Sequence, residues 1–277
     1  MIYYFTGSGN SEAVALALGS LVGDSVQKAG AFYIADTESL GFVFPVYSWG
    51  IAPFLLEWIG RVKLPDKKPS YIYAVLDYGD EAGYAHKMLR KALLKRGLVL
   101  DAVFGVKMPN TYVLLPGFNV DSSVIAAAKV ADSIAWLKKT AERVKNREMN
   151  IEDVYVGPLP GLKSGVIFPL FKKWGIFPSR WHYDPDKCIG CGQCAHACPV
   201  GNVTMVDQQP IYSGNGNDCG LYLGGGHPQW GKNCTSCLGC YHACPEHAVR
   251  YGHDTIKKGQ WRFWFTHGRH TLLSGDK

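Results

Sequence analysis

The chain has 277 residues, of which 47% are hydrophobic and 13% aromatic, and its formal net charge at pH 7 is +6. This composition excludes a disordered or fibrous protein, and no apolar run is long enough to span a bilayer. The opening MIYYFTGSGNS lacks the basic and apolar regions of a secretory signal peptide, so we expect a cytoplasmic protein whose nine cysteines stay reduced.

The first residues predict a strand, a loop and a helix in that order. Met1–Phe5 is aromatic and β-branched, and Glu12–Leu21 is apolar enough to pack on a sheet. The loop between them, Thr6–Ser11, consists of hydroxyl, glycine and amide residues that can cradle an anion at a helix start. It contains neither the lysine of a triphosphate loop nor GxGxxG, so it suits the monoester phosphate of FMN. A simple turn is the alternative interpretation.

The rest of the first half repeats this alternation of strand and helix. Five strands with intervening helices predict a doubly wound parallel sheet, in which ligands bind beyond the carboxyl ends of the strands. The further strands are expected at Ala31–Ile34, Gly41–Val46, Tyr71–Asp77 and Leu98–Val106, and the further helices at Pro53–Val62, Tyr84–Arg96 and Ser122–Arg147.

Aromatic residues and glycines gather in the loops PVYSWG, DYGDEAG and MPNTYV that follow these strands. A flat isoalloxazine ring needs flat apolar walls, and Tyr47, Trp49, Tyr78 and Tyr112 are candidates. Packing at the base of each loop is the alternative for any one of them.

Three carboxylates, Asp77, Asp80 and Glu81, lie close together in one of these loops. Acidic residues are common where a helix begins, and we favour that role. A role in proton transfer at a flavin nitrogen is the alternative.

The second half carries one cysteine spacing twice, as CIGCGQCAHACP from Cys188 and CTSCLGCYHACP from Cys234. In this CxxCxxCxxxCP signature three thiolates hold one cubane and the fourth reaches the other cluster. Zinc and disulfides are weaker alternatives because neither needs eight cysteines in two identical runs. We therefore expect two [4Fe-4S] clusters, the first held by Cys188, Cys191, Cys194 and Cys244 and the second by Cys234, Cys237, Cys240 and Cys198.

Three further segments and one pair of histidines have separate expectations. The linker 150–181 is rich in Pro, Gly and bulky apolar residues, and we expect it to join the domains rather than bind a membrane surface. A glycine-rich insertion, 213–231, contains Cys219, which we do not expect to bind iron. His196 and His242 occupy equal offsets in the two runs and are expected to face solvent, the alternative being an imidazole that couples electron to proton uptake at a cluster. The tail, 253–277, is aromatic and basic, with no assigned role.

The positive charge is expected to compensate buried anionic cofactors, so we expect no nucleic-acid partner and no membrane. Binding of nucleic acid is the weaker alternative.

The opening YFTGSGNS, FPVYSWGIAP, KMPNTYV and the two cysteine runs together resemble the flavodoxin and 4Fe-4S ferredoxin fusion proteins of anaerobic bacteria and archaea. The resemblance covers Met1 to about Gly252. It implies a flavodoxin-like FMN domain at 1–149, a small α+β ferredoxin-like domain at 182–252, and electron transfer between them. By position it implies phosphate contacts from Thr6, Ser8, Gly9, Asn10 and Ser11. It implies ring contacts from Tyr47, Ser48, Trp49, Tyr78 and Gly79. Further candidates for cofactor binding, from the same loops, are Pro45, Gly50, Asp77, Asn110 and Tyr112.

We therefore expect an electron-transfer iron-sulfur flavoprotein that relays electrons between two clusters and FMN, with a redox protein as donor or acceptor. The alternative is an FMN-dependent reductase of a quinone, a nitro compound or dioxygen, fed by its own clusters. The sequence leaves the oligomeric state open, with a homodimer as one candidate.

Overall fold

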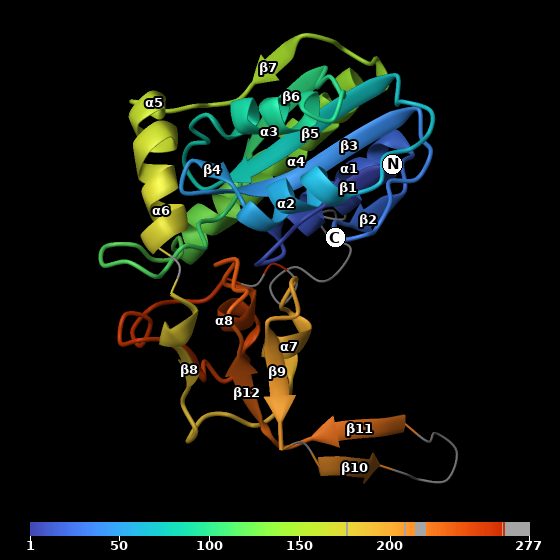
Figure 1. Cartoon of the computed structure of the whole chain (residues 1–277). Coiled ribbons are helices and arrows are strands. Elements are labelled where there is room, and N and C mark those ends of the chain that lie inside the picture. The colour runs from blue at the N-terminus through green and yellow to red at the C-terminus, as the bar shows by residue number, and fades with distance from the viewer. Residues whose placement is uncertain (176, 208, 214–219, 262, 264–277) are drawn as a thin grey trace. The chain divides into compact units, whose positions relative to one another are not determined.

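The computed structural model describes residues 1–175, 177–207, 209–213, 220–261 and 263. These residues form two compact units (Figure 1). Unit 1 comprises 1–111, 121–175 and the chain from Trp261, whereas unit 2 comprises 112–120 and 176–260. The chain therefore passes between the units at four places.

Unit 1 is built on a parallel sheet whose strands run in the order β2-β1-β3-β5-β6-β7. Without the edge strand β7, this is the 2-1-3-4-5 order of the flavodoxin-like fold. The short β4 pairs antiparallel with β3. The strands are β1 (Ile2–Tyr4), β2 (Val26–Lys28), β3 (Ser39–Tyr47), β4 (Gly50–Ile51), β5 (Tyr71–Tyr78), β6 (Ala102–Lys107) and β7 (Ile151–Asp153).

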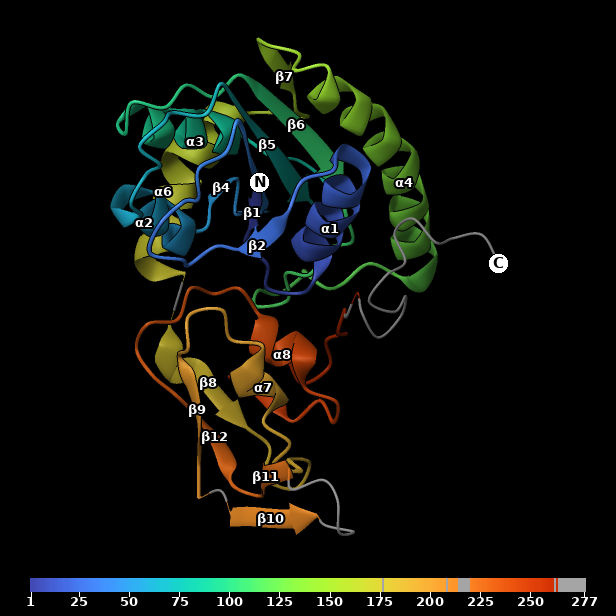
Figure 2. The ribbon, with the colours of Figure 1, turned by 90° about the vertical axis from the view of Figure 1, so that its right-hand side faces the viewer.

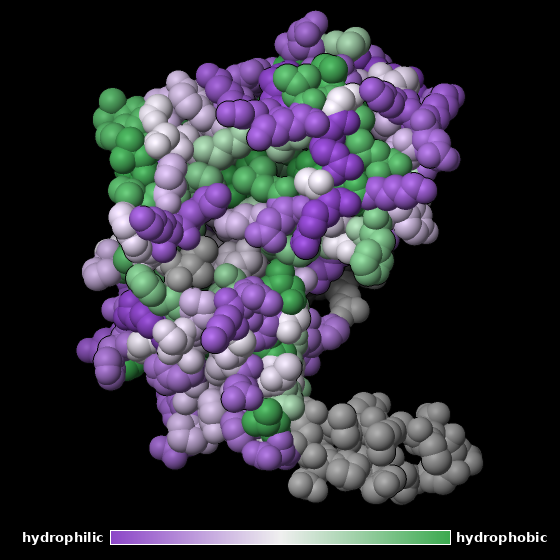
Figure 3. Space-filling view, in the orientation of Figure 1, coloured by the Kyte–Doolittle hydropathy of each residue, from purple (hydrophilic) through white to green (hydrophobic). Residues whose placement is uncertain are grey.

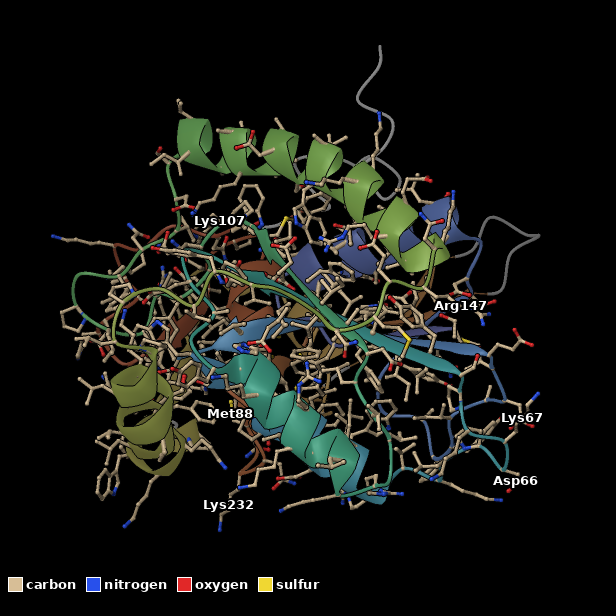
Figure 4. The ribbon with its side chains drawn as sticks, turned by 90° about the horizontal axis from the view of Figure 1, so that it is seen from above. Asp66, Lys67, Met88, Lys107, Arg147 and Lys232 are labelled. Atoms are coloured by element: carbon tan, nitrogen blue, oxygen red, sulfur yellow. The ribbon has the colours of Figure 1, made fainter. Side chains whose placement is uncertain are left out.

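Helices cover both faces of this sheet. Strand β5 is buried along its whole length, as expected for a central parallel strand whose sequence, YIYAVLDY, does not alternate. Figure 2 shows α1 and α4 on one side of the strands and α2 and α3 on the other. Seen from above, α4 and α3, which carries Met88, again lie on opposite sides (Figure 4). The helices are α1 (Asn10–Val22), α2 (Pro53–Arg61), α3 (Ala85–Leu94) and α4 (Ser123–Lys145).

The predicted fold class is confirmed for this unit, but one predicted strand is misplaced. Ala31–Ile34 forms only an isolated bridge from Tyr33 to Lys63, and β2 lies earlier, at Val26–Lys28. Phe32 is 93% exposed, so the apolar run that suggested a strand is not buried. The true edge strand, VQK, is short and mostly exposed, and it has no apolar pattern to reveal it.

Much of the segment expected to link the domains belongs to unit 1. It forms α5 (Pro160–Leu162), a π-helical turn η1 (Lys163–Ile167) and α6 (Phe168–Trp174). Phe168 is buried over Gly50, where a Cβ atom would lie 2.5 Å from its ring. Leu162, Leu170 and Trp174 are exposed, and an apolar area is visible at this place in Figure 3.

The described residues of unit 2 form three antiparallel ladders and two short helices. β8 (Trp181–Tyr183) pairs with β13 (Val249–Tyr251), β9 (Val203–Val206) with β12 (His227–Trp230), and β10 (Gln209–Ser213) with β11 (Gly220–Gly224). The helices are α7 (Gln193–His196) and α8 (Gly239–Ala243), and a 3-10 turn η2 spans Pro178–Arg180. Cys194, Cys240 and Cys244 lie in its apolar core, together with Val113 and Leu114 from the loop after β6.

The expected insertion, 213–231, has different bounds in the structure. Its last part forms β12, which pairs with β9, so the excursion from this ladder covers 207–226. The alternation of apolar and polar residues that would have marked β12 as a strand is short, and it directly follows a run of glycines. Cys219 lies outside the described residues, as does most of the tail. Within the described part of the chain, no helix combines the length and apolar character needed to cross a membrane.

Candidate functional sites

Eight cysteines of unit 2 surround two hollows, four at each. The first hollow is lined by Cys188, Cys191, Cys194 and Cys244. The second is lined by Cys198, Cys234, Cys237 and Cys240. Each set thus combines three thiols of one run with the last thiol of the other run.

The backbone that carries the cysteines needs positive φ angles at two places in each run. In the first run these places hold Gly190 (φ 67°) and Gly192 (φ 71°), which adopt the left-handed region at no steric cost. The equivalent residues of the second run are Ser236 (φ 56°) and Leu238 (φ 61°). A β-carbon on Gly190 would also lie 2.9 Å from the backbone of Gly225. The loops therefore keep one geometry although only the first has glycine at these two positions.

Backbone amides point at several of the sulfurs. Asn202 N–H donates to Cys198 Sγ at 3.1 Å, and Ala248 N–H donates to Cys244 Sγ at 3.1 Å. Such N–H···S bonds are typical of sulfurs that carry negative charge in a cluster.

Burial makes free thiolates unfavourable at these positions. It raises the pKa of Cys194 to about 11 and that of Cys237 to about 12. A nearby cation would be needed to hold these buried sulfurs as thiolates.

The arrangement of the thiols suits a cluster better than a single ion. Among the described residues, no group of three or more His, Cys, Asp or Glu side chains is placed to hold one metal ion. In a cubane each iron takes one protein thiolate, so the four sulfurs surround the cluster instead of converging on one point. Two four-thiol hollows are that kind of site.

The two equivalent histidines differ in their surroundings. His196 on α7 is exposed, in keeping with the expected solvent-facing position. His242 on α8 is only 1% exposed, and its ring packs edge-on against Tyr241 at 5.1 Å. The expectation is therefore wrong for His242, because α8 lies in the core of unit 2 and α7 lies nearer its surface.

The candidate phosphate loop lies between β1 and α1. Gly9 is the N-cap of α1 with φ 98°, and no side chain of the described residues caps this helix. Thr6 Oγ1 accepts a hydrogen bond from Gly9 N–H at 3.0 Å. The Asn10 side chain donates to Pro109 O at 3.0 Å, so it ties α1 to the loop after β6. The uncapped first turn leaves N–H donors that an anion can use.

Two buried polar groups meet behind this loop, Ser11 in the first turn of α1 and Asp77 at the end of β5. Neither Ser11 Oγ nor Asp77 Oδ1 has a hydrogen-bond partner of good geometry within the described chain. Burial raises the pKa of Asp77 to about 7, and the nearby Ser11 hydroxyl offsets this rise only in part. Asp77 is therefore a carboxyl group that can gain or lose a proton near neutral pH.

The loop after β3 is a tight hairpin turn. Ser48 (φ 46°) and Trp49 (φ 62°) both adopt left-handed conformations between Tyr47 and Gly50, which pair across the turn. Trp49 Nε1 donates to Glu81 Oε1 at 2.6 Å, and Lys163 forms an ion pair with the same carboxylate. These contacts fix the orientation of the Trp49 indole.

Glu81 and Asp80 do not cap α3, because within the described chain this helix has no side-chain cap and no acidic residue in its first turn. The helix-start interpretation of these carboxylates is thus wrong. Glu81 instead holds Trp49 and Lys163, whereas Asp80 accepts a hydrogen bond from Asn110 Nδ2 at 3.1 Å. Their positions come from contacts with other loops, which spacing along the chain does not reveal.

The loops after β5 and β6 are joined through Asn110. Its Nδ2 also contacts Asp121 Oδ1 at 3.3 Å, and Lys129 of α4 pairs with Asp121 at 2.7 Å. A Cβ atom on Gly79 would lie 1.7 Å from Asn110 Oδ1. The contact between the loops after β5 and β6 therefore requires glycine at position 79. Asp121 and Lys129 also take part in this contact, and the sequence did not indicate them.

Two of the candidate ring walls are engaged elsewhere. Tyr78 packs over Gly105, and its hydroxyl accepts a hydrogen bond from Tyr155 N at 3.1 Å. Because side chains alternate along a strand, its neighbour Asp77 faces the opposite side of the sheet. Tyr112 belongs to unit 2, where it packs edge-on against Phe118 at 5.5 Å.

A residue that sequence reasoning missed contacts the phosphate loop. Trp261, from the segment treated as a tail, is buried and donates from Nε1 to Asn10 Oδ1 at 2.7 Å. With Pro109 O on its other side, the Asn10 amide is bonded at both ends. A buried tryptophan N–H usually finds an acceptor, but the sequence does not show which one.

Comparison with known proteins identifies the cysteine region. Two family models, each described as a 4Fe-4S dicluster domain, match residues 187–249 and 142–203. Ferredoxin-3 of Nostoc sp. is 29% identical over 79 residues, which cover 27% of this chain and 76% of that protein. One component of the ferredoxin:CoB-CoM heterodisulfide reductase of Methanosarcina mazei is 44% identical over 34 residues, 12% of this chain, and the chain spans only 4% of its length.

Two solved structures are similar to about half of the chain. The Trp repressor binding protein of Bacillus subtilis is 14% identical, with a TM-score of 0.34 over 52% of this chain and 96% of that one. The rubredoxin oxygen:oxidoreductase of Desulfovibrio gigas is 19% identical, with a TM-score of 0.33 over 52% and 34%. The flavodoxin-like assignment of unit 1 depends on its own strand order.

The chain therefore joins a flavodoxin-like domain to a region that matches 4Fe-4S dicluster domains.

Proposed function

We propose that this chain relays electrons between two [4Fe-4S] clusters in unit 2 and an FMN in unit 1. The proposal depends on one observation above all: eight thiols form two sets of four, each completed by a cysteine from the other run. When bound, a cubane exchanges single electrons and FMN exchanges one or two.

In the proposed clusters, Cys188, Cys191, Cys194 and Cys244 are the ligands of the first and Cys198, Cys234, Cys237 and Cys240 those of the second. Exposure differs between the sets, since Cys191 is exposed and no cysteine of the second set is. The first cluster would thus offer a sulfur to a docking redox protein, whereas the second set has no exposed cysteine.

The FMN part of the proposal is supported by chemistry at the end of the sheet. The uncapped start of α1, with Thr6, Ser8 and Gly9 before it, would hold the phosphate. The unsatisfied Ser11 hydroxyl supplies one further polar group. The turn residues Tyr47 and Trp49 and the backbone of Gly79 would border the ring.

Asp77 would hold a proton near this site at neutral pH. Its pKa of about 7 lets it exchange that proton without a large change in free energy. This property also serves the alternative function, reduction of a small substrate by FMN, because such a reaction consumes protons.

Anaerobic purification with iron, sulfide and flavin analysis tests the proposal. We expect about eight iron atoms and about eight sulfides per chain, and one FMN. A stepwise reductive titration should then reduce both clusters and the flavin. Zinc in place of iron would contradict the cluster assignment, and cluster-loaded protein that binds no added FMN would contradict the relay.

A further inference from the structure

Buried polar groups are distributed unequally between the two cysteine hollows. Within the described chain, two side-chain donors that line the second hollow are buried without a hydrogen-bond partner, the Trp230 indole N–H and the Thr235 hydroxyl. Neither is exposed, and Thr235 as a whole is only 6% exposed. Among the residues that the structure describes, no such unsatisfied donor lines the first hollow.

A buried donor without an acceptor costs free energy, so each of these groups requires an explanation. The Trp230 indole N–H is directed at Cys240, although without the geometry of a hydrogen bond, and its ring stacks on Trp181 at 6.4 Å with 16° between the planes. This stacking holds Trp230 beside the second hollow. Sulfurs of a bound cluster would be the acceptors that both donors lack.

The two sets also differ in exposure, since no cysteine of the second set is exposed and Cys191 of the first set is. Burial disfavours the extra negative charge of a reduced cluster, and hydrogen bonds to its sulfurs favour that charge. The donors are therefore found at the hollow that has no exposed cysteine.

We propose that Trp230 and Thr235 donate hydrogen bonds to sulfurs of the second cluster and selectively raise its reduction potential. Reduction adds one electron to the cluster, and both donors keep their protons. The hydrogen bonds offset the effect of burial on this cluster. Its reduction potential then stays close to the reduction potential of the first cluster. This inference rests on the proposed presence of two clusters.

The test uses anaerobically loaded full-length protein and follows each cluster by EPR during a redox titration with mediators. Trp230→Phe keeps the ring and removes the N–H, and Thr235→Val keeps the side-chain shape and removes the O–H. Tyr183→Phe, which changes a residue lining the first hollow, is the matched control. Cys198→Ser identifies the signal of the second cluster.

We expect Trp230→Phe and Thr235→Val each to lower the potential of the second cluster only. At a fixed solution potential, its ratio of reduced to oxidised form should fall on the order of fivefold, as for the loss of one hydrogen bond. Tyr183→Phe should leave the second cluster unchanged.

Unchanged potentials in both variants, or an equal shift of both clusters, would overturn the inference. Iron and sulfide analysis separates this result from failure of the proposed function. A protein with two intact clusters and no selective shift refutes only the role of Trp230 and Thr235, whereas a protein without clusters refutes the proposed function itself.

Discussion

The indole nitrogen of Trp261 lies 2.7 Å from Oδ1 of Asn10, although 251 positions separate the two residues in the chain. Asn10 is the first residue of α1 and directly follows the candidate phosphate loop. A segment beyond the last cysteine run thus helps to position the beginning of the flavodoxin-like unit.

We expect Trp261→Phe to destabilise unit 1 and to weaken FMN binding. The phenyl ring can still pack, but Asn10 Oδ1 loses its donor in a buried place, at a cost of about 1–3 kcal/mol. Thermal unfolding and a fluorescence titration with FMN measure the two effects. Trp174→Phe is the control, because Trp174 is 54% exposed and its change should leave both quantities nearly constant. Equal effects of the two substitutions would contradict this role of Trp261.

Asp77→Asn should stabilise the protein at alkaline pH and much less at acidic pH. Burial raises the pKa of Asp77 from 3.8 to about 7, so the folded state binds a proton more tightly than the unfolded state. Stability is therefore lost as the pH rises from about 4 to about 7, by up to ~4 kcal/mol, and the loss then levels off. The measurement is the free energy of urea unfolding at pH 5 and pH 8 for both proteins. If Asp77→Asn raises the free energy of unfolding by the same amount at both pH values, Asp77 does not titrate in this range.

Gly79→Ala should break the junction between the loops after β5 and β6. The added methyl group would lie 1.7 Å from Asn110 Oδ1, so the Asn110 side chain must leave Asp80 and Asp121. We expect a loss of about 1–3 kcal/mol in unfolding free energy. Gly60→Ala is the matched control, because no atom of the described chain crowds its added carbon within 4 Å and Gly60 is inside α2. If both substitutions change the melting temperature by the same amount, crowding against Asn110 is not the cause of the destabilisation by Gly79→Ala.

Cys198→Ser and Cys244→Ser should damage opposite clusters. Cys198 lies in the first run but lines the second hollow, and Cys244 lies in the second run but lines the first. We expect Cys198→Ser to lose or alter the second cluster and Cys244→Ser the first, as measured by iron content and by EPR of each reduced cluster. Loss of the first cluster in Cys198→Ser would refute the exchange of ligands between the runs.

Much of the fold could be predicted because its signals are local. Buried strands such as Tyr71–Tyr78 and the helix at Ser123–Lys145 are long and strongly patterned. The spacing of the cysteines likewise indicated which thiols would gather, since a compact cluster limits how the chain can surround it.

Other features depend on single contacts between distant segments, which spacing does not encode. β2 is a three-residue edge strand of polar sequence, so neither length nor pattern marks it. Tyr112 packs in unit 2 and Trp261 in unit 1, although each lies in sequence beside residues of the other unit. Glu81 and Asp80 likewise have partners on separate loops.

The exchange of the fourth thiol between runs has a consequence for biosynthesis. A nascent chain that has emerged as far as Asn233 holds three sulfurs of the first set and one of the second. The second set is complete when Cys240 emerges from the ribosome and the first only at Cys244. Neither set of four thiols can therefore be completed during translation before the second run has been made.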